Sequence, residues 1–345
     1  MTRRRALLTV CGVFLAAGLI AAAPAGAPDR IRLKPEVEAF IAKMAQDHGF
    51  DRERLRTTMG ALKPNEDIIK AFERPSTAKP WHEFRGIFVT PTRIEGGVKF
   101  WQEHAPLLQR AREVYGVPPE LIVSIIGVET IYGRRTGGFR VIDSLYTLGF
   151  EVERRAQFFR GEFEHFLLLT RDNGLDPLQV KGSFAGAMGV PQFIASSYRS
   201  YAVDFDGDGR VDLWNSIADV IGSVANFLHA HGWAAGQPVT VPARLSGGDA
   251  LALLERGLKP NLTLAEMKTR GVEPTEELPE SVEAGLFSLD GKDAQEHWIS
   301  LQNFYVITRY NRSKNYAMAV YQLAQQIAEA YAQGPGASQS VAAQP

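Results

Sequence analysis

Residues 118–133 read PPELIVSIIGVETIYG, a pattern typical of one helix at the centre of a domain. The paired prolines suit its first turn, and Gly133 suits its end. Seven of the positions between them hold Leu, Ile or Val, which leaves almost no polar face. We therefore expect this helix to be buried nearly all round.

Glu129 lies inside this apolar run, one helical turn after Ile125 and Ile126. Removing a carboxylate from water is costly, so a buried Glu either finds a partner or raises its pKa and keeps its proton near neutral pH. A protonated, partly buried Glu is the group that general-acid chemistry requires. The alternative is a structural Glu that pairs with Arg134 or Arg135.

The N-terminus has the pattern of a signal peptide. Three arginines precede an apolar run over 6–23, and small residues at 23–25 offer a cleavage site. We expect cleavage after residue 25 and a periplasmic protein, with a twin-arginine signal or an uncleaved anchor as alternatives. Cys11 is the sole cysteine, and Val10 stands where a lipid-attachment site needs a small residue, which disfavours a lipoprotein.

The composition is that of an ordinary globular protein. The 345 residues suffice for one large domain or two to three lobes. The formal net charge of −1 gives no basic stripe, which argues against nucleic acid as a partner. We assign 26–333 to one functional region and expect the Gly-, Ser- and Ala-rich tail, 334–345, to be disordered.

Hydrophobic periodicity predicts a mainly helical chain with few strands. We interpret 74–91 as an irregular aromatic segment and the Phe-rich stripe from Phe158 to Leu167 as core. Helices are expected at 31–49, twice within 51–72, at 93–115, 154–170, 216–233 and 314–331, a short helix or turn at 141–148, and strands at 238–245 and 297–307.

The segment 181–193, KGSFAGAMGVPQF, is rich in glycine. Small residues interleaved with Ser, Met, Gln and Phe suit a groove wall that packs against sugar rings. No strand is expected before it, which excludes a phosphate-binding loop. The alternative is a Gly-rich connector without a function of its own.

The segment 204–212, DFDGDGRVD, carries the most specific metal signal in the chain. Its acids and central Gly have the spacing of a Ca²⁺-binding loop, in which Arg210 would contribute its backbone carbonyl. Asn215 stands where such loops have a bidentate Glu, so Asp219 is the candidate for the missing ligand. The predicted ligands are Asp204, Asp206, Asp208, Arg210, Asp212 and Asp219. The alternative is a solvated turn, and Mg²⁺ suits the loop less well.

Four motifs in one order resemble the family of membrane-bound lytic murein transglycosylase B, glycoside hydrolase family 103. They are GVETIYG around Glu129, KGSFAGAMGVPQF from Lys181, DFDGDG with a following Leu-Trp, and NFYVITRYN from Asn303. The resemblance covers roughly 35–332. It implies an α+β, mainly helical fold, with a lysozyme-like core, an additional helical lobe and a small lobe that carries an EF-hand-like loop.

The resemblance also implies cleavage of the β-1,4 bond between N-acetylmuramic acid and N-acetylglucosamine, which forms 1,6-anhydromuramyl products. Glu129 falls on the family's catalytic Glu. Groove-lining positions fall on Ser183, Gln192, Tyr310, Asn311 and Tyr316, and we expect Met188 and Phe193 to pack against sugars. Gln192 and Tyr310 would hold sugars and the Glu129 carboxyl, Ser183 would orient the acetamido group, and Tyr316 would offer an aromatic face.

This chemistry needs one carboxyl group where most glycosidases need two. Asp143 is the nearest acid downstream and lies in no comparable motif. Two alternatives stay open: a hydrolytic muramidase, and a non-catalytic, Ca²⁺-dependent peptidoglycan-binding protein. We expect glycan strands and proteins of wall synthesis or remodelling as partners, a monomer, a structural Ca²⁺ and no catalytic cofactor.

Overall fold

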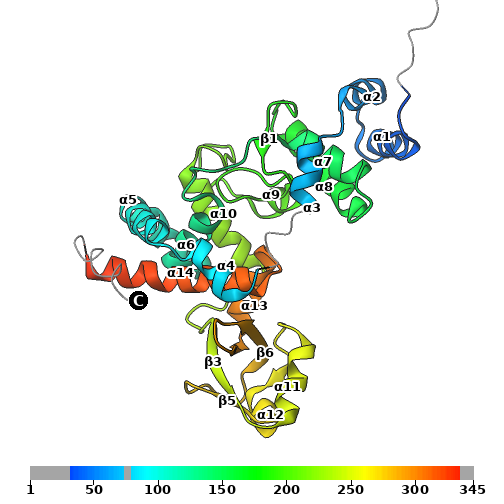
Figure 1. Cartoon of the computed structure of the whole chain (residues 1–345). Helices are drawn as coiled ribbons and strands as arrows, with labels where there is room; N and C mark the ends of the chain where they lie inside the picture. Colours follow the sequence, from blue (N-terminus) through cyan, green and yellow to red (C-terminus); the bar gives the residue numbers. More distant parts are fainter. Residues whose placement is uncertain (1–31, 74–78, 335–345) are drawn as a thin grey trace, which may run out of the picture.

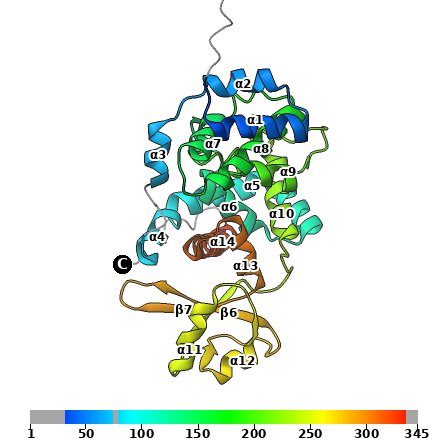
Figure 2. The same cartoon turned by 90° about the vertical axis from the view of Figure 1, so that its right-hand side faces the viewer.

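The structure is a computed structural model that describes residues 32–73 and 79–334. The predicted signal peptide, including Cys11, and the tail from residue 335 onwards lie outside these residues. Two views at right angles show three stacked tiers: an upper helical lobe, a central helical layer and a lower lobe built on a sheet (Figures 1 and 2).

The two helical tiers share one hydrophobic core. The upper tier contains α1 (Pro35–His48), α2 (Arg52–Ala61), α3 (Glu66–Glu73), α7 (Val141–Phe150) and α8 (Ala156–Asp172). The central layer contains α4 (Trp81–Phe88), α5 (Pro91–Tyr115), α6 (Pro119–Thr130), α10 (Ile217–Ala230), α13 (Gln302–Tyr310) and α14 (Lys314–Gln333). Helix α9 (Ala195–Tyr201) packs against α8 and α10. Strand β1 (Phe139–Arg140) pairs antiparallel with β2 (Lys181–Gly182), which follows α7 and α8 in the chain.

Helix α6 is buried as its sequence predicts. It packs against α5, α10 and α14, and ten of its twelve residues are buried. Ser124, a buried polar residue, donates a hydrogen bond to the carbonyl of Val320 in α14 at 2.6 Å. The helix that carries Glu129 is thus held on several sides and has little freedom to move.

The end of α6 differs from the expectation of a simple glycine stop. Ile131 and Tyr132 both adopt left-handed backbone conformations, with φ of 52° and 57°, before Gly133. Non-glycine residues rarely adopt this conformation, so the surrounding structure must stabilise it. The Tyr132 ring fits a slot whose walls are Gly96, Gly97 and Gly127, where an added Cβ would come within 2.7 Å of Tyr132 atoms.

The lower lobe is a five-stranded antiparallel sheet with its own core. The strand order is β4 (Leu262–Thr263), β6 (Glu283–Asp290), β7 (Gln295–Ser300), β3 (Thr240–Leu245) and β5 (Val272–Pro274), and α11 (Gly248–Ala252), the 3₁₀ turn η2 (Leu253–Arg256) and α12 (Leu264–Thr269) complete the lobe. Phe287 stacks on Phe304 of α13 with ring centroids 4.4 Å apart, which joins the lobe to the central layer.

Most predicted elements are confirmed, and the fold is α+β and mainly helical as expected. The irregular segment at 74–91 is wrong in part, because α4 forms there and buries Trp81 and Phe84 on one face. The strand at 297–307 is also wrong in part. It ends at Ser300, and α13 follows because Phe304, Val306 and Ile307 pack with helical spacing.

Two further details correct the sequence-based prediction. Phe158 is 39% exposed, while Phe159, Phe163, Phe166 and Leu167 are core residues. The acidic loop 204–212 lies between α9 and α10, against the helical core, and not in a small lobe of its own. The small lobe is the sheet lobe, whose chain begins after this loop.

Candidate active site

Glu129 is partly buried at the last turn of α6, where it accepts a hydrogen bond from another part of the chain. The Tyr316 hydroxyl donates to Oε1 of Glu129 at 2.6 Å, and Tyr316 itself is 4% exposed. Within residues 32–73 and 79–334, no Lys, Arg or His forms an ion pair with Glu129. The structural alternative, a pair with Arg134 or Arg135, is therefore not what the structure shows.

The surroundings of Glu129 favour its protonated form. Burial raises the pKa of Glu129 to about 7, and the hydrogen bond from Tyr316 opposes this rise because it stabilises the carboxylate. A carboxyl group that titrates near neutral pH can give up a proton in one step and take one back in the next. The electrostatics therefore suit an acid–base group at this position.

Two tyrosines from the α13–α14 corner lie beside this carboxyl group. Their rings are nearly parallel, with centroids 6.5 Å apart and an interplanar angle of 9°. Tyr310 donates its hydroxyl hydrogen bond to the carbonyl of Pro191 at 2.5 Å, and Asn311 is exposed and accepts from the Ser313 amide. The prediction that Tyr310 holds the Glu129 carboxyl is corrected, since Tyr316 does so.

The glycine-rich segment forms a wall that is fixed by its own polar side chains. Ser183 Oγ accepts hydrogen bonds from the amides of Ala185 and Ala187 at 3.2 and 3.0 Å. Gln192, with φ of 53°, donates from Nε2 to the carbonyls of Gly189 and Thr136 at 2.8 and 3.0 Å. Both predicted groove residues thus stabilise the wall, and both keep part of their surface exposed.

Met188 and Phe193 lie behind this wall. They are 0% and 2% exposed, and their backbones pair with each other through hydrogen bonds of 2.8 and 3.0 Å. The prediction that their side chains pack against sugars is corrected, because buried side chains offer no surface to a ligand. Their apolar side chains anchor the wall in the core.

Sequence reasoning missed the residues that join the wall to α6. Thr130 donates from Oγ1 to the carbonyl of Val190 at 2.8 Å and accepts from the Gly133 amide. Tyr132 donates to the carbonyl of Arg93 at 2.6 Å. The signal that could have revealed the Tyr132 slot is the Gly96-Gly97 pair, since glycines inside a helix usually have a packing reason.

The acidic loop brings three carboxyl groups together. Oxygen atoms of Asp204, Asp206 and Asp219 lie within 4.8 Å of one another. Asp219 is 1% exposed and accepts from the amides of Phe205 and Asp212 at 2.7 and 2.8 Å. Amide hydrogen bonds, that from Gly209 first, lower the pKa of Asp204 and keep it charged.

This cluster suits a hard divalent cation, because its oxygen ligands converge and one of them is buried. Asp208 and Asp212 are not part of the cluster. They accept hydrogen bonds from nearby amides, Asp208 from Arg210 and Asp212 from Trp214 and Asn215. Asp219 therefore takes the place that the sequence left open at Asn215.

The fold and the buried Glu129 carboxyl together indicate a lysozyme-like protein of the glycan-cleaving class. A family model described as "Transglycosylase SLT domain" matches residues 32–325, and the chain belongs to this family.

Three relatives illustrate the similarity. Membrane-bound lytic murein transglycosylase B of Escherichia coli (strain K12) is 45% identical over 309 residues, which cover 87% of this chain and 84% of the relative. The structure of soluble lytic transglycosylase SltB1 from Pseudomonas aeruginosa is 47% identical with a TM-score of 0.80, covering 86% of this chain and 100% of that one. The structure of the Escherichia coli lytic transglycosylase Slt35 in complex with calcium is 44% identical with a TM-score of 0.77, covering 87% and 94%.

Proposed function

We infer that this protein is a peptidoglycan lytic transglycosylase in which Glu129 acts as the single acid and base. The observation that carries the inference is the Glu129 carboxyl group, buried without a cationic partner in the described residues and hydrogen-bonded by Tyr316. Membership of the transglycosylase family and the murein-cleaving relative support the substrate class.

The first step breaks the glycosidic bond. Protonated Glu129 transfers its proton to the oxygen that leaves with N-acetylglucosamine, and the C1–O bond opens toward an oxocarbenium-like muramyl species. Since Tyr316 donates to Oε1, the transferable proton belongs on Oε2. The same hydrogen bond stabilises the carboxylate that this step produces.

The second step closes the ring. The Glu129 carboxylate takes the proton from the C6 hydroxyl of the muramyl unit, and that oxygen forms a bond to C1 of the same sugar. The product is a 1,6-anhydromuramyl end, and Glu129 regains its proton. No water is consumed, so exclusion of water at this stage separates the reaction from hydrolysis.

The environment of Asp143 favours this route over a hydrolytic muramidase. Asp143 receives two hydrogen bonds from the Arg140 guanidinium, at 2.7 and 2.8 Å, so both of its carboxyl oxygens are engaged. A two-carboxylate mechanism needs a second acid free to act as base or nucleophile. The nearest downstream acid is already engaged, so the mechanism with one Glu is favoured.

We place the glycan strand along the wall between α6 and the α13–α14 corner. Ser183, Gln192, Tyr310 and Asn311 are the proposed substrate-binding residues. Tyr316 is buried, so it offers no aromatic face to a sugar and acts through its hydrogen bond to Glu129 instead. The catalytic region corresponds to 26–333. We further propose that the protein is a periplasmic monomer, exported with a cleaved signal peptide and without a lipid anchor. Proteins of wall synthesis or remodelling are the proposed further partners. Cell fractionation with sequencing of the mature N-terminus tests the localisation.

Among the described helices, none has the length and apolar character needed to cross a membrane.

We propose that the acidic loop holds a structural Ca²⁺ through Asp204, Asp206 and Asp219. Asp208, Arg210 and Asp212 are the other residues that the sequence assigns to this site. The bound ion would supply positive charge opposite these carboxylates. Val190, in the wall, donates its amide hydrogen bond to the carbonyl of Leu213 at 2.8 Å, so order in this loop supports the wall.

Mass spectrometry of fragments released from purified peptidoglycan tests the function. We expect fragments lighter by one water than those made by a hydrolase, and none from Glu129→Gln. Glu120→Gln, the same substitution in the first turn of α6, is the control and should release fragments as the unmodified protein does. Reducing ends would indicate a muramidase, and tight binding without release would indicate a binding protein.

A further inference from the structure

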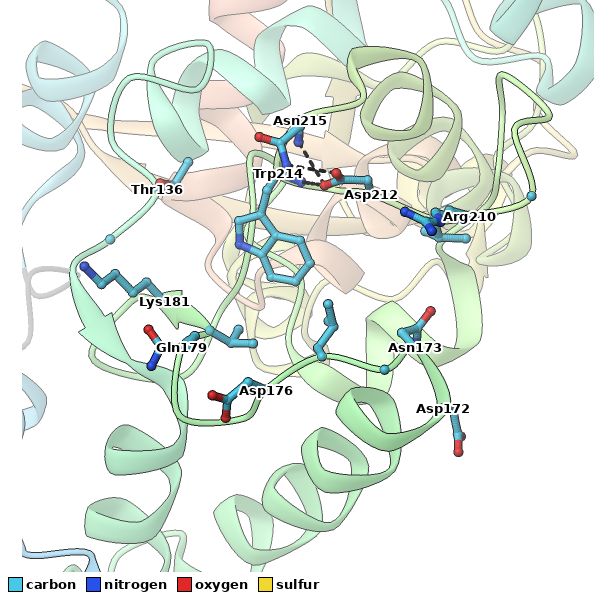
Figure 3. Close-up of a pocket in the computed structure, with 16 residues that line it drawn as sticks. Thr136, Asp172, Asn173, Asp176, Gln179, Lys181, Arg210, Asp212, Trp214 and Asn215 are labelled. Carbon is cyan, nitrogen blue, oxygen red and sulfur yellow. Dashed lines mark hydrogen bonds between the residues drawn. The ribbon is translucent and has the colours of Figure 1, made fainter.

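A pocket of about 860 Å³ lies between the C-terminal end of α8, the segment 173–181 and the acidic loop (Figure 3). It is separate from Glu129, which does not line it. Trp214 occupies its centre, with Lys181 and Gln179 on one side and Arg210 and Asn173 on the other. None of these residues has a part in the proposed bond cleavage.

We propose that this pocket binds a distal sugar unit of the glycan strand, with Trp214 as the platform on which the sugar ring stacks. This inference rests on the proposed function and adds to it a second place where the same polymer is held. The ligand class is a neutral N-acetylhexosamine unit.

The indole ring of Trp214 is fixed before a ligand arrives. It packs against Tyr198, with ring centroids 5.8 Å apart and an interplanar angle of 36°. The Trp214 amide donates to Asp212 Oδ1 at 2.8 Å, and Asp219 in turn accepts from the Asp212 amide. A preorganised aromatic face loses little conformational freedom on binding, which is the property of a binding anchor.

The rim of the pocket offers polar groups that the protein itself does not use. In the part of the chain that the structure describes, the side chains of Thr136, Gln179 and Lys181 form no hydrogen bond or ion pair. Asn173 donates from Nδ2 to the carbonyl of Leu169, which leaves its Oδ1 free to accept. Donors and acceptors around an apolar face match the hydroxyl and acetamido groups of a sugar.

The charges of the rim disfavour strongly charged ligands. Lys181 and Arg210 carry positive charge, while Asp172, Asp176 and Asp212 carry negative charge within the same lining. A polyanion would meet the three carboxylates, and a polycation would meet the two basic groups. A neutral saccharide meets neither penalty.

The pocket is continuous with the wall beside Glu129. Lys181 lies in β2, which leads directly to Ser183, and β1 pairs with β2 through Phe139 and Gly182. Gln192 donates to the carbonyl of Thr136, so a proposed groove residue contacts the pocket rim. A strand bound along the wall can therefore extend into the pocket, and long strands should gain affinity that short ones lack.

The test compares peptide-free glycan strands of increasing length in two assays. The first measures kcat/KM for cleavage, and the second measures the Kd for Glu129→Gln by calorimetry, which needs no cleavage. For long strands, we expect Trp214→Ala to lower kcat/KM about fivefold or more and, combined with Glu129→Gln, to raise the Kd by a similar factor. Both constants should stay unchanged for the shortest cleaved strands, as expected for loss of an aromatic anchor. Trp214→Phe should keep most of the kcat/KM and of the affinity for long strands.

Gln179→Ala/Lys181→Ala is a second variant that alters exposed side chains only, so misfolding does not obscure its result. We expect a smaller loss for long strands, and none for the control Lys99→Ala/Gln109→Ala on the surface of α5. Equal effects at all lengths, no effect of Trp214→Ala, or an effect confined to peptide-bearing strands would overturn the proposal. If no strand is cleaved, the proposed function fails, and the calorimetric length dependence still decides the pocket.

Discussion

Glu129 and the acidic loop place the same chemical group in opposite surroundings. Glu129 lies at the end of an apolar helix, accepts one hydrogen bond from Tyr316, and has a pKa raised to about 7. Asp204 lies in an exposed loop, accepts from the amides of Gly207, Asp208 and Gly209, and has a lowered pKa. One carboxyl group is prepared to exchange a proton, and the other is kept charged.

The difference shows which local features set the role of a carboxyl group. Water is removed around Glu129 without a compensating cation, so the charged form is disfavoured. Backbone amides in the loop point at Asp204 and stabilise its charge, as a bound cation would do further. Substitutions and ligands that change the surroundings of either carboxyl group should therefore change its pKa or its contribution to stability.

The largest effect on this comparison should come from Glu129→Gln, which removes the charge that burial disfavours. Below the unfolded pKa of about 4.5, both states of the unmodified protein hold the proton and burial costs nothing. As pH rises to about 7, Glu129 ionises in the unfolded chain before it does in the folded protein. The free energy of unfolding of the unmodified protein therefore falls by about 3 kcal/mol relative to that of the variant. Denaturant unfolding at pH 4.5 and pH 8 measures this difference.

Glu120→Gln again serves as the control and should show no such divergence with pH. A Glu129→Gln variant no more stable than the unmodified protein at pH 8 would contradict a burial-driven pKa.

Ca²⁺ should affect the loop and not α6. A ligand at 100 times its Kd stabilises the folded state by about 2.7 kcal/mol, so we expect the melting temperature to rise with Ca²⁺ concentration. Asp206→Asn should reduce this rise, whereas Asp249→Asn in α11 should leave it unchanged. Calorimetric scans over a Ca²⁺ series measure both, and an identical response of the two variants would contradict the site.

Gly127→Ala tests whether the slot around Tyr132 holds the end of α6. An added Cβ would lie 2.5 Å from the Tyr132 hydroxyl, so Tyr132 must move. We expect the free energy of unfolding to fall by about 2 kcal/mol and the activity to fall as well. Gly161→Ala in α8 is the matched control, because nothing lies within 4 Å of its Cβ and alanine favours a helix. Urea unfolding should show a lower free energy of unfolding for Gly127→Ala and a higher one for Gly161→Ala. Equal free energies for the two variants would argue against the slot.

Tyr316→Phe should give the smallest change in stability, about 1 kcal/mol for the lost hydrogen bond. Its more informative effect is on pH dependence. The Tyr316 hydroxyl lowers the pKa of Glu129, so its loss should move the alkaline limb of the activity profile to higher pH. Tyr310→Phe removes a hydroxyl that binds the Pro191 carbonyl and should leave this limb in place. A shift to lower pH in Tyr316→Phe would contradict the assignment.

The sequence predicted features that depend on local pattern. The apolar run around Glu129 is continuous, so its burial followed from helical periodicity. The convergence of Asp204 and Asp206 followed from loop spacing. Asp219 lies in the first turn of α10, which begins shortly after the loop, so the predicted helix at 216–233 brings it to them.

The features that the sequence left undetermined depend on long-range packing. Tyr316 meets Glu129 across 187 positions, and which tyrosine of the α13–α14 corner does so depends on how α13 ends at Tyr310. Met188 alternates with small residues in a manner that fits an exposed wall equally well, and its burial is decided by the pairing with Phe193. The left-handed Tyr132 needs glycines from α5, more than thirty positions earlier.

The titration of Glu129 itself tests the central claim most directly. Nuclear magnetic resonance of isotope-labelled glutamate carboxyl groups, with Glu129→Gln to assign the signal, gives its pKa in the free protein. We predict a value of about 7, with activity falling as pH rises through that value because the acid form is lost. A pKa near the ordinary value of 4.5 would contradict the claim that burial keeps Glu129 protonated for catalysis.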